Sequence, residues 1–246
     1  MHDKFHDSAG VPWEGREFSQ NSWSQDDGST PQALADVLDG QLDKQALFGA
    51  LSQSRLLIPL LAELGESGIG AHGELVDKSA ELAIVAVSTP DGKTAIPAFS
   101  SVAEMTAWNS TARPVPVEAA KLAIAAISEG HERVILNPAS SAIAIRRPAL
   151  AALAQGLSWI TPDQNDLVLQ MIQKASAQQF EIQSVRAFDG DPAARLLKPE
   201  LGLEIKLVAG LSQQQLEQVL TQFGAKLQTQ EFLQLVDSFT VKLVAG

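Results

Sequence analysis

The pattern of hydrophobic and polar positions predicts a mixture of short strands and short helices from about residue 30 onward. Apolar residues recur at three- and four-residue spacing, as on one face of a helix, in the ranges 31–40, 43–53, 101–108, 117–129, 148–154, 163–175 and 212–223. Continuous or alternating apolar runs, which are typical of strands, lie at 55–63, 81–88, 94–99, 134–138, 141–145, 182–188, 203–209 and 239–244. We therefore expect an α+β fold made of two small mixed α/β domains, each a sheet of strands packed by capped helices.

Polar capping residues mark several of the expected helix starts. Thr30, followed by Pro31, and Asp43 are expected to cap the first two helices. Three further starts have the capping-box pattern, in which Ser or Thr is followed three positions later by Glu or Gln: Ser101–Glu104, Thr161–Gln164 and Ser212–Gln215. In the stretch AIPAFSSVAEMTAWN, residues 95–109, the marked residues thus have structural roles and form no nucleophile–base pair.

Proline and glycine predict the breaks between elements. The turn residues 89–93, TPDGK, are expected to join the strands 81–88 and 94–99 into a hairpin. The proline-rich residues 113–116, RPVP, are interpreted as a link before a long helix. Pro59 lacks an amide hydrogen, so the strand that contains it is expected to lie at a sheet edge or a bulge.

Composition and patterning divide the chain into three parts. Residues 1–29 are polar and acidic, with scattered aromatic side chains and no sustained apolar period, and are expected to form a tail. We expect one domain over residues 30–160 and a second over residues 161–246, with the boundary near Ser158–Pro162.

The chain is acidic, and its negative charge argues against some classes of binding partner. Its 246 residues have a formal net charge of −11, and residues 1–50 hold 9 acidic and 3 basic side chains. Such a surface repels phosphate groups, which argues against nucleic acid and anionic membranes as partners. An acidic tail that carries aromatic residues is instead suited to docking on a basic protein partner.

Cysteine is absent, which excludes disulfides, a thiolate nucleophile and a cysteine-ligated zinc site, and fits a reducing compartment. No apolar run approaches the roughly 20 residues of a membrane span. The N-terminus, MHDKFHDSAG, lacks the apolar segment of a secretory signal. We expect a soluble cytoplasmic protein.

The stretch IPAFSSxxEMxxW and the later VILNP are the most distinctive motifs of the chain. They contain Ile96, Pro97, Phe99, Ser100, Ser101, Glu104, Met105, Trp108, Asn137 and Pro138. Over roughly residues 43–155 the chain resembles the N-terminal domain of the SseB family, which is named for enhanced serine sensitivity and is found in bacteria. That family's F-T-S is F-S-S here, and residues 65–73 look like an insertion.

Residues 180–246 are similar, more weakly, to the C-terminal domain of the same family. The resemblance implies an α+β fold and a soluble bacterial protein. It implies no reaction and no catalytic residues.

Two patterns fall short of a cofactor or metal site. Residues 68–73, GIGAHG, match the glycine pattern of dinucleotide-binding loops, but residues 74–79 are too short and polar for the helix that such a loop must open. His2 and His6 are spaced like metal ligands on a helix, but ordering a chain terminus costs conformational entropy. We assign no catalytic, cofactor-binding or metal-binding residues.

Arginines beside a predicted helix start provide the best small-ligand hypothesis. Arg146 and Arg147 follow the strand 141–145 and precede a helix, so they could hold a carboxylate or phosphate near free helix amides. Arg55, at the start of another strand, and Asn137, between a strand and a proline, could join them. The alternative interpretation is that the arginines are solvated and Asn137 makes a local turn bond.

Three functions remain open on the sequence. The leading interpretation is a non-catalytic interaction or regulatory protein, because capping and packing account for the marked residues. The second is a domain that binds a small anionic metabolite through the Arg146 and Arg147 region. The third is an enzyme that uses carboxylates such as Glu81, Asp91 or Glu132, although no spacing singles out a pair.

Overall fold

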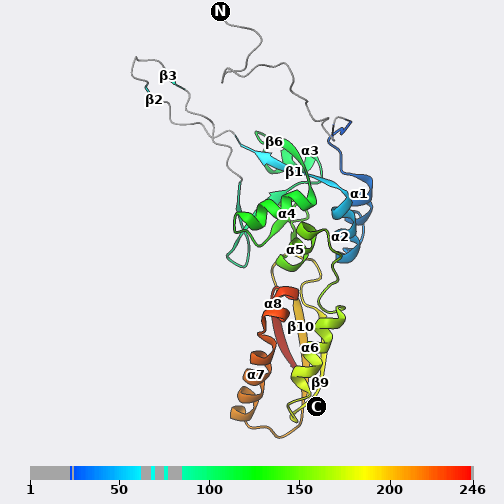
Figure 1. Cartoon of the computed structure of the whole chain (residues 1–246), viewed down its shortest axis with the longest axis vertical. Coiled ribbons are helices and arrows are strands. Elements are labelled where there is room, and N and C mark those ends of the chain that lie inside the picture. The colour runs from blue at the N-terminus through cyan, green and yellow to red at the C-terminus, as the bar shows by residue number, and fades with distance from the viewer. Residues whose placement is uncertain (1–22, 24, 62–67, 70–74, 77–84, 245–246) are drawn as a thin grey trace, which may run out of the picture.

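The structure is a computed structural model that describes residues 23, 25–61, 68–69, 75–76 and 85–244. It has the expected α+β fold. An N-terminal half with helices α1–α5 and a C-terminal half with helices α6–α8 lie end to end, so that the molecule is elongated (Figure 1).

The N-terminal half packs short helices around short strands. Its helices are α1 (Gln32–Leu38), α2 (Lys44–Gln53), α3 (Val102–Trp108), α4 (Ala119–Ser128) and α5 (Arg147–Gln155). Its strands are β1 (Arg55–Leu60), β2 (Gly68–Ile69), β3 (Leu75–Val76), β4 (Val87–Ser88), β5 (Thr94–Ala98), β6 (Arg113–Glu118), β7 (Val134–Leu136) and β8 (Ile143–Ile145).

The central sheet of this half has the order β4-β5-β7-β8, in which β5 and β7 run parallel and the other neighbours run antiparallel. Strands β1 and β6 form a separate antiparallel pair. Leu57 in β1 and Phe99, just after β5, exchange backbone hydrogen bonds of 2.9 Å, which join the pair to the central sheet. The core lies between these strands and helices α2, α4 and α5.

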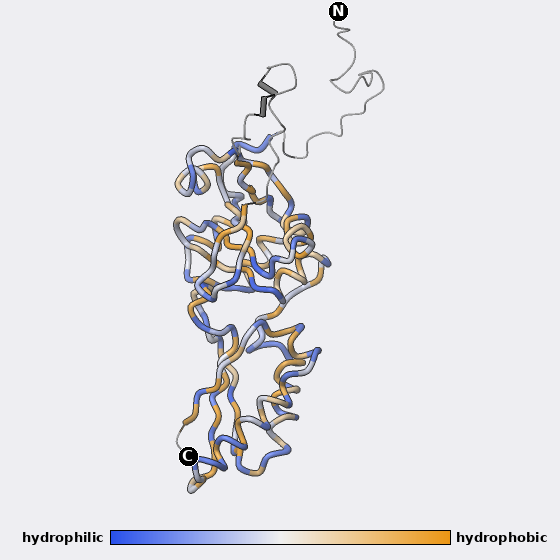
Figure 2. The backbone as a smooth tube through the Cα atoms, turned by 90° about the vertical axis from the view of Figure 1, so that its left-hand side faces the viewer, coloured by the Kyte–Doolittle hydropathy of each residue, from blue (hydrophilic) through white to orange (hydrophobic). Residues whose placement is uncertain are grey.

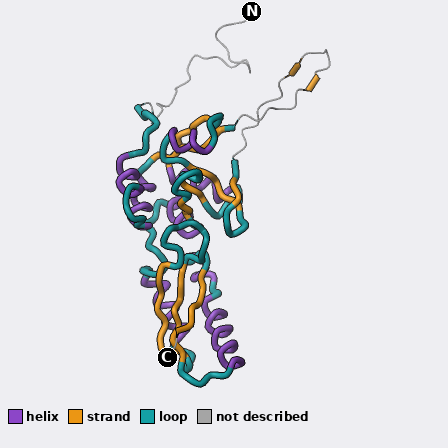
Figure 3. The backbone as a smooth tube through the Cα atoms, turned by 180° about the vertical axis from the view of Figure 1, so that it is seen from behind, coloured by secondary structure: helices purple, strands orange, loops and turns teal. Residues whose placement is uncertain are grey.

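The C-terminal half is a three-stranded sheet covered by helices on one face. Its elements are α6 (Asp166–Ser176), β9 (Ile182–Asp189), β10 (Leu201–Leu207), α7 (Gln213–Leu227), α8 (Gln230–Leu235) and β11 (Phe239–Val244). The order is β11-β10-β9, with β10 parallel to β11 and antiparallel to β9. Seen from behind, the strands lie in front of the helices (Figure 3).

Alternation along these strands explains the one-sided packing. Hydrophobic and hydrophilic residues alternate along them (Figure 2). Leu201, Leu203 and Ile205 of β10 are buried in a second core with residues of α6, α7 and α8. Arg186 and Glu204 pair across β9 and β10 at 3.1 Å on the opposite face. Each half therefore has its own hydrophobic core.

The helix caps confirm some predictions and correct others. Asp43 caps α2 and Ser212 forms a capping box with Gln215 at α7, as expected. Thr30 does not cap α1, because its hydroxyl donates to that of Ser100 at 3.1 Å and Pro31 occupies the cap position. The prediction of a capping box at Thr161 and Gln164 is wrong.

The residues from Thr161 to Gln164 instead form a turn, closed by a 2.9 Å backbone hydrogen bond. Helix α6 begins later and is capped by Asn165. At α3, Ser101 accepts from the amide of Glu104 as predicted, but the Glu104 carboxylate accepts from the hydroxyl of Ser140 at 2.6 Å rather than from the cap.

The proline-rich link predicted at residues 113–116 is part of strand β6, and α4 begins only at Ala119. Pro59 and Pro114 lie opposite one another in the β1–β6 pair. A strand with only one partner leaves every second amide unpaired, so proline fits at those positions. The prediction that the strand containing Pro59 lies at a sheet edge or a bulge is consistent with the two-stranded β1–β6 sheet. The prediction of a link at residues 113–116 is wrong.

The hairpin at residues 81–99 is confirmed for its described part, with β4 and β5 joined by a turn in which Gly92 has φ 78°. Residues 81–84 lie outside the described residues, as do Gly70, Gly73, His2 and His6. The described residues near the glycine pattern form a strand pair, in which Gly68 faces Val76. No helix among the described residues has the length and apolar character needed to cross a bilayer.

One loop of the C-terminal half packs into the N-terminal half. Residues 190–200, here called the insertion loop, connect β9 to β10. Ala194 is buried in the first core, and its carbonyl accepts a 2.7 Å hydrogen bond from the amide of Ala144 in β8. Leu196 is buried against Ile135 and Ala144. The two halves are thus interlocked, and the domain boundary near Ser158–Pro162 stays a prediction.

Candidate functional site

The four predicted ligand residues belong to two different hydrogen-bond networks. Arg55 and Asn137 both contact Ser100, at the end of β5. Arg146 and Arg147 contact the C-terminal half instead. The structure therefore does not bring all four into one site.

Arg55 is buried and binds backbone and carboxylate oxygens of the chain itself. Its guanidinium forms a bidentate pair with Asp26, with one bond of 2.7 Å, and donates to the carbonyls of Ser29 at 2.6 Å and Ser100 at 2.5 Å. The hydrogen bond from Arg55 lowers the pKa of Asp26. Arg55 thus fastens the last residues of the predicted tail to the N-terminal half.

Asn137 connects the ends of two strands. Its Oδ1 accepts from the amide of Ser100 at 2.9 Å, and its Nδ2 donates to the Ser100 hydroxyl at 3.0 Å. Asn137 has φ 50°, a left-handed conformation that Asn tolerates better than most residues. Both atoms of its side-chain amide thus bind Ser100, 37 positions away, rather than making only the local turn bond of the alternative interpretation.

Arg146 lies at the contact between the two halves. It is the N-cap residue of α5 and is 6% exposed. Its Nη2 donates to Asp191 at 2.7 Å and to the Lys198 carbonyl at 2.7 Å, and its Nη1 donates to Asp237 at 2.9 Å. Burial acts to lower the pKa of Arg146, but the hydrogen bonds to Asp191 and Asp237 outweigh it, so the pKa is raised.

Arg133 and Arg147 extend the same contact. The buried Arg133 pairs with Asp237 at 3.0 Å and with Asp91 at 2.7 Å. Arg147 donates to the carbonyls of Leu233 and Val236 at the end of α8, the latter at 3.1 Å. Three arginines of the N-terminal half thus bind oxygen atoms of the C-terminal half. We call Arg133, Arg146, Asp191 and Asp237 the interhalf ion cluster.

Glu200, at the end of the insertion loop, is buried beside this cluster. One of its carboxylate oxygens accepts from the amide of Asp237 at 2.7 Å. Burial raises the pKa of Glu200 to about 7, and the nearby charge of Asp237 adds to the increase, while Arg146 and Lys44 oppose it. Glu200 therefore titrates near neutral pH.

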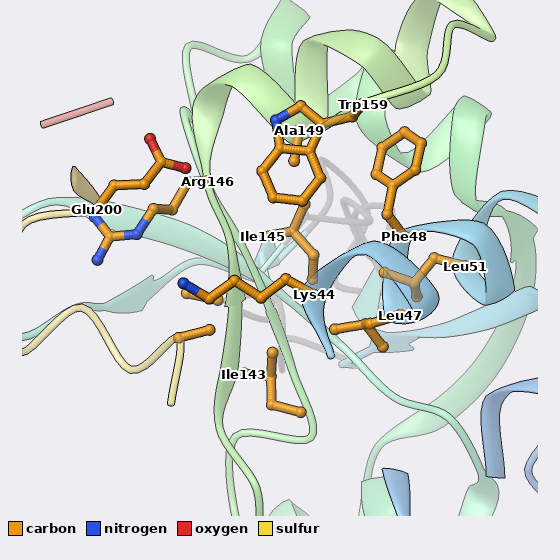
Figure 4. A pocket seen from close by; sticks show the side chains of 12 residues that line it. Lys44, Leu47, Phe48, Leu51, Ile143, Ile145, Arg146, Ala149, Trp159 and Glu200 are labelled. Atoms are coloured by element: carbon orange, nitrogen blue, oxygen red, sulfur yellow. The ribbon is translucent and has the colours of Figure 1, made fainter. Parts of the chain in front are cut away.

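A cavity of about 30 Å³ lies next to Glu200 and Arg146 (Figure 4). The side chain of Lys44 extends from α2 to the end of the cavity where Arg146 and Glu200 lie, and it pairs with Asp189 at 2.7 Å. Leu47, Phe48, Ile145 and the indole of Trp159 form its apolar side. Within the described residues, Trp159 Nε1 and Arg146 Nε have no hydrogen-bond partner.

The dimensions and charges of this cavity limit what it can hold. A space of about 30 Å³ is enough for one or two water molecules, whereas small-molecule sites usually enclose at least roughly 300 Å³. Asp191 and Asp237 already neutralise Arg146. The assignment of an anionic ligand to Arg55, Asn137, Arg146 and Arg147 stays a prediction, and these two observations weigh against it.

Two of the carboxylates that the sequence suggested for an enzyme, Asp91 and Glu132, form ion pairs with basic side chains. Asp91 accepts from the Thr89 hydroxyl at 2.5 Å and pairs with Arg133. Burial acts to raise the pKa of Asp91, but these two contacts lower it overall. Glu132 pairs with Lys93 at 2.5 Å, and this hydrogen bond lowers its pKa. Glu81 lies outside the described residues.

Sequence reasoning missed the acidic members of the interhalf ion cluster. Asp191 lies 45 residues after Arg146 and Asp237 lies 91 residues after it. No local spacing connects them, and only the turn-like sequence DGDP at residues 189–192 marks the loop that carries Asp191. Among the described residues no group of three or more His, Asp or Glu side chains could hold a metal ion.

Comparison with known proteins identifies the N-terminal half. Residues 31–152 match the family model described as the SseB protein N-terminal domain. No curated protein and no solved structure matches the chain. The weaker similarity of residues 180–246 to the C-terminal domain of the family stays a prediction. The matched range contains the IPAFSS and VILNP motifs, the arginines of both networks and helices α1 to α4, and through this domain the chain belongs to the SseB family.

Proposed function

We propose that this protein is a soluble, cytoplasmic and non-catalytic binding protein that docks a basic amphipathic helix of a partner protein. The observation that supports this proposal is an exposed apolar surface on the N-terminal half. We call it the α4 face and define it as Ala120, Ile124 and Ile127 of α4, together with Leu157 just after α5.

The α4 face is apolar although it is in contact with solvent. Leu122, Ala123 and Ala126 turn the other side of α4 into the core. Ile124 is 52% exposed, Ile127 is 45% exposed and Leu157 is 57% exposed. Ala120, Ile124 and Ile127 are separated by four and three positions, so they lie along one stripe of the helix. Contiguous exposed apolar side chains of this kind are typical of protein-interaction sites.

A groove of about 540 Å³ continues the α4 face toward α2. Ala120 and Leu157 line it together with Phe48, Gly49 and Trp159. Gly49 lies inside α2, where glycine is less favourable than alanine, and its missing side chain leaves open space. The absence of a side chain at Gly49 thus deepens the groove at a cost to helix stability.

The shape and charge of this surface favour one kind of occupant. A groove beside a helical stripe matches the mode in which an amphipathic helix inserts side chains at three- and four-residue spacing. Both ends of α4 carry an exposed acidic residue, Glu118 before the helix and Glu129 after it. The whole chain has a net charge of −11. A partner helix with basic residues flanking its apolar face is therefore complementary in charge.

A displayed library of amphipathic helical peptides with varied charge tests this function. We expect the full-length protein to select peptides with a basic polar face, and Ile127→Asp to weaken the selected peptides by about 10-fold or more, since an interface anchor contributes more than about 1.4 kcal/mol. Leu167→Asp is the matched control, because Leu167 is similarly exposed, at 57%, but lies on α6. Selection of no peptide, or equal weakening by both variants, would contradict the proposal.

The groove provides a second, independent variant pair. Gly49→Leu fills the groove, whereas Gly224→Leu adds the same side chain at a helix-interior glycine of α7 that also has open space around it. Gly49→Leu is expected to abolish peptide binding and Gly224→Leu to leave it unchanged. Unchanged affinity of the selected peptide for the Gly49→Leu variant would contradict a role for the groove in peptide binding.

A further inference from the structure

Another pocket, separate from the α4 face and from the interhalf ion cluster, lies beside the distinctive motifs of the sequence. It has a volume of about 330 Å³, within the usual range of small-molecule sites. Trp108 and Pro138, two of the motif residues, line it together with Ile135 and with Leu197 of the insertion loop. We call it the Trp108 pocket.

Unusual backbone conformations are concentrated around this pocket. Among the described residues, the non-glycine residues with positive φ are Asn137, Ala142, Ala194 and Leu196, at 50°, 48°, 51° and 59°. Ala142 and Leu196 line the Trp108 pocket, and the other two directly precede the lining residues Pro138 and Arg195. Conformations of this kind cost free energy and are concentrated at ligand-binding and other functional sites.

In the insertion loop, the positive φ angles of Ala194 and Leu196 accompany an alternation of buried and exposed side chains. Ala194 and Leu196 turn inward and are buried in the N-terminal half, whereas the intervening Arg195 is exposed. Leu197, which is 70% exposed, also lines the pocket. The loop therefore lines the pocket with one cationic side chain, Arg195, and with the apolar side chains of Leu196 and Leu197.

The side chains around the pocket define the chemistry of a ligand. Trp108 is half-buried and is supported by the ring of Phe99, at a centroid distance of 5.3 Å. Arg195 makes one long contact of 3.5 Å, to the carbonyl of Ser140, and no carboxylate of the described residues pairs with it. This contrasts with Arg146, which has two carboxylate partners. Arg195 is thus a guanidinium available to an anion beside an apolar, aromatic wall.

We propose that the Trp108 pocket binds a small organic carboxylate with a flat apolar body. The apolar body lies against Trp108, Ile135 and Pro138, and the carboxylate accepts hydrogen bonds from Arg195. A charge-assisted bond to a guanidinium and the burial of a flat apolar group supply the affinity. The α4 face is not involved, so failure of the peptide experiment leaves this site unaffected.

Three matched compounds test the chemistry of the pocket. Phenylacetate has the flat body and the charge, phenylacetamide has the body without the charge, and acetate has the charge without the body. Each is titrated into the full-length protein while the indole N–H resonances are followed by NMR, with Trp108→Phe used to assign the Trp108 signal. We expect phenylacetate to shift the Trp108 resonance with saturation, and the other two to bind about 10-fold more weakly or worse.

Variants at exposed positions locate the site without threatening the fold. Arg195→Gln is expected to weaken phenylacetate by about 10-fold, because the charge-assisted bond is lost. Leu197→Asp is expected to weaken it at least as much, because it places a negative charge beside the carboxylate. Arg113→Gln is the control, since Arg113 is an exposed arginine in β6. Lack of saturable binding, equal affinity for phenylacetamide, or an unchanged affinity in Arg195→Gln would each overturn the proposal.

Discussion

The guanidinium of Arg146 lies 2.9 Å from the carboxylate of Asp237, and this pair joins the two halves of the molecule. Arg146 occupies the N-cap position of α5, where a positive charge alone is unfavourable. Asp191 and Asp237 supply the negative charge there. Two carboxylates of the chain itself thus lie beside Arg146, where the sequence suggested an anionic ligand, and that ligand stays a prediction.

Removal of the Asp237 charge tests the role of the interhalf ion cluster. Asp237→Asn leaves Arg133 without one of its carboxylate partners and Arg146 with Asp191 alone, both buried. Breaking a buried ion pair in this way costs about 3–5 kcal/mol of unfolding free energy. Urea denaturation measures the loss.

The matched control is Glu118→Gln, which removes the exposed pair between Glu118 and Lys121 at 3.1 Å. Exposed pairs contribute less than about 1 kcal/mol. Equal and small effects of the two variants would show that the cluster does not hold the halves together.

The titration of Glu200 predicts a pH dependence of stability. Its pKa is raised from 4.5 to about 7 in the folded state, so the folded protein binds more protons than the unfolded chain between these values. The unfolding free energy therefore falls as the pH rises through this window, by about 3 kcal/mol in total from this group. Chemical denaturation at pH 5, 6, 7 and 8 measures the decrease.

Glu200→Gln isolates this contribution. The amide oxygen can still accept from the amide of Asp237, but the side chain no longer titrates. We expect the variant to lack this decrease between pH 5 and 8 and to be more stable than the parent protein at pH 8. A decrease of the same size in the variant would assign the pH dependence to other groups.

Sequence patterns predicted the elements whose causes are local. Asp43 and Ser212 cap their helices because the amides they accept from are two or three residues away. Leu47, Phe48 and Leu51 face the core as their spacing predicts. The hairpin turn at residues 89–93 likewise depends on its own proline and glycine, with Gly92 at positive φ.

Patterns failed where a distant partner decides the outcome. The residues RPVP become a strand because β1, more than fifty positions earlier in the chain, pairs with them. Thr30 loses its capping role to a hydrogen bond with Ser100. The role of Arg146 depends in the same way on Asp191 and Asp237. A sequence shows which side chains are charged, but the fold decides whether their partners are protein or ligand.

Two helix-interior glycines are predicted to lower the stability of the protein relative to alanine. Gly49 in α2 and Gly224 in α7 have open space where a Cβ atom would lie. Alanine at either position should raise the unfolding free energy by about 0.5–1 kcal/mol, because glycine is the poorer helix former. Thermal denaturation of the two single variants measures the gain. A loss of stability in Gly49→Ala would mean that the glycine is required by the fold rather than by the groove.

Gly190 at the base of the insertion loop predicts the opposite effect. A Cβ atom there would lie 2.3 Å from the carbonyl oxygen of Pro199, a backbone atom that cannot turn aside. Gly190→Ala should therefore lower the unfolding free energy by at least about 2 kcal/mol, as for other overpacked sites. Gly40→Ala, with open space at that position, is the control. Similar stability of the two variants would indicate that the base of the loop can rearrange.

Site-specific photocrosslinking in the host cell tests the central claim most directly. A photoreactive phenylalanine analogue replaces Ile124 on the α4 face in one variant, and Leu167, exposed on α6, in another. We predict a discrete covalent adduct with one partner protein from position 124, through a basic helical segment of that partner, and no such adduct from position 167. Equal labelling from both positions, or none from position 124, would contradict a docking role for the α4 face.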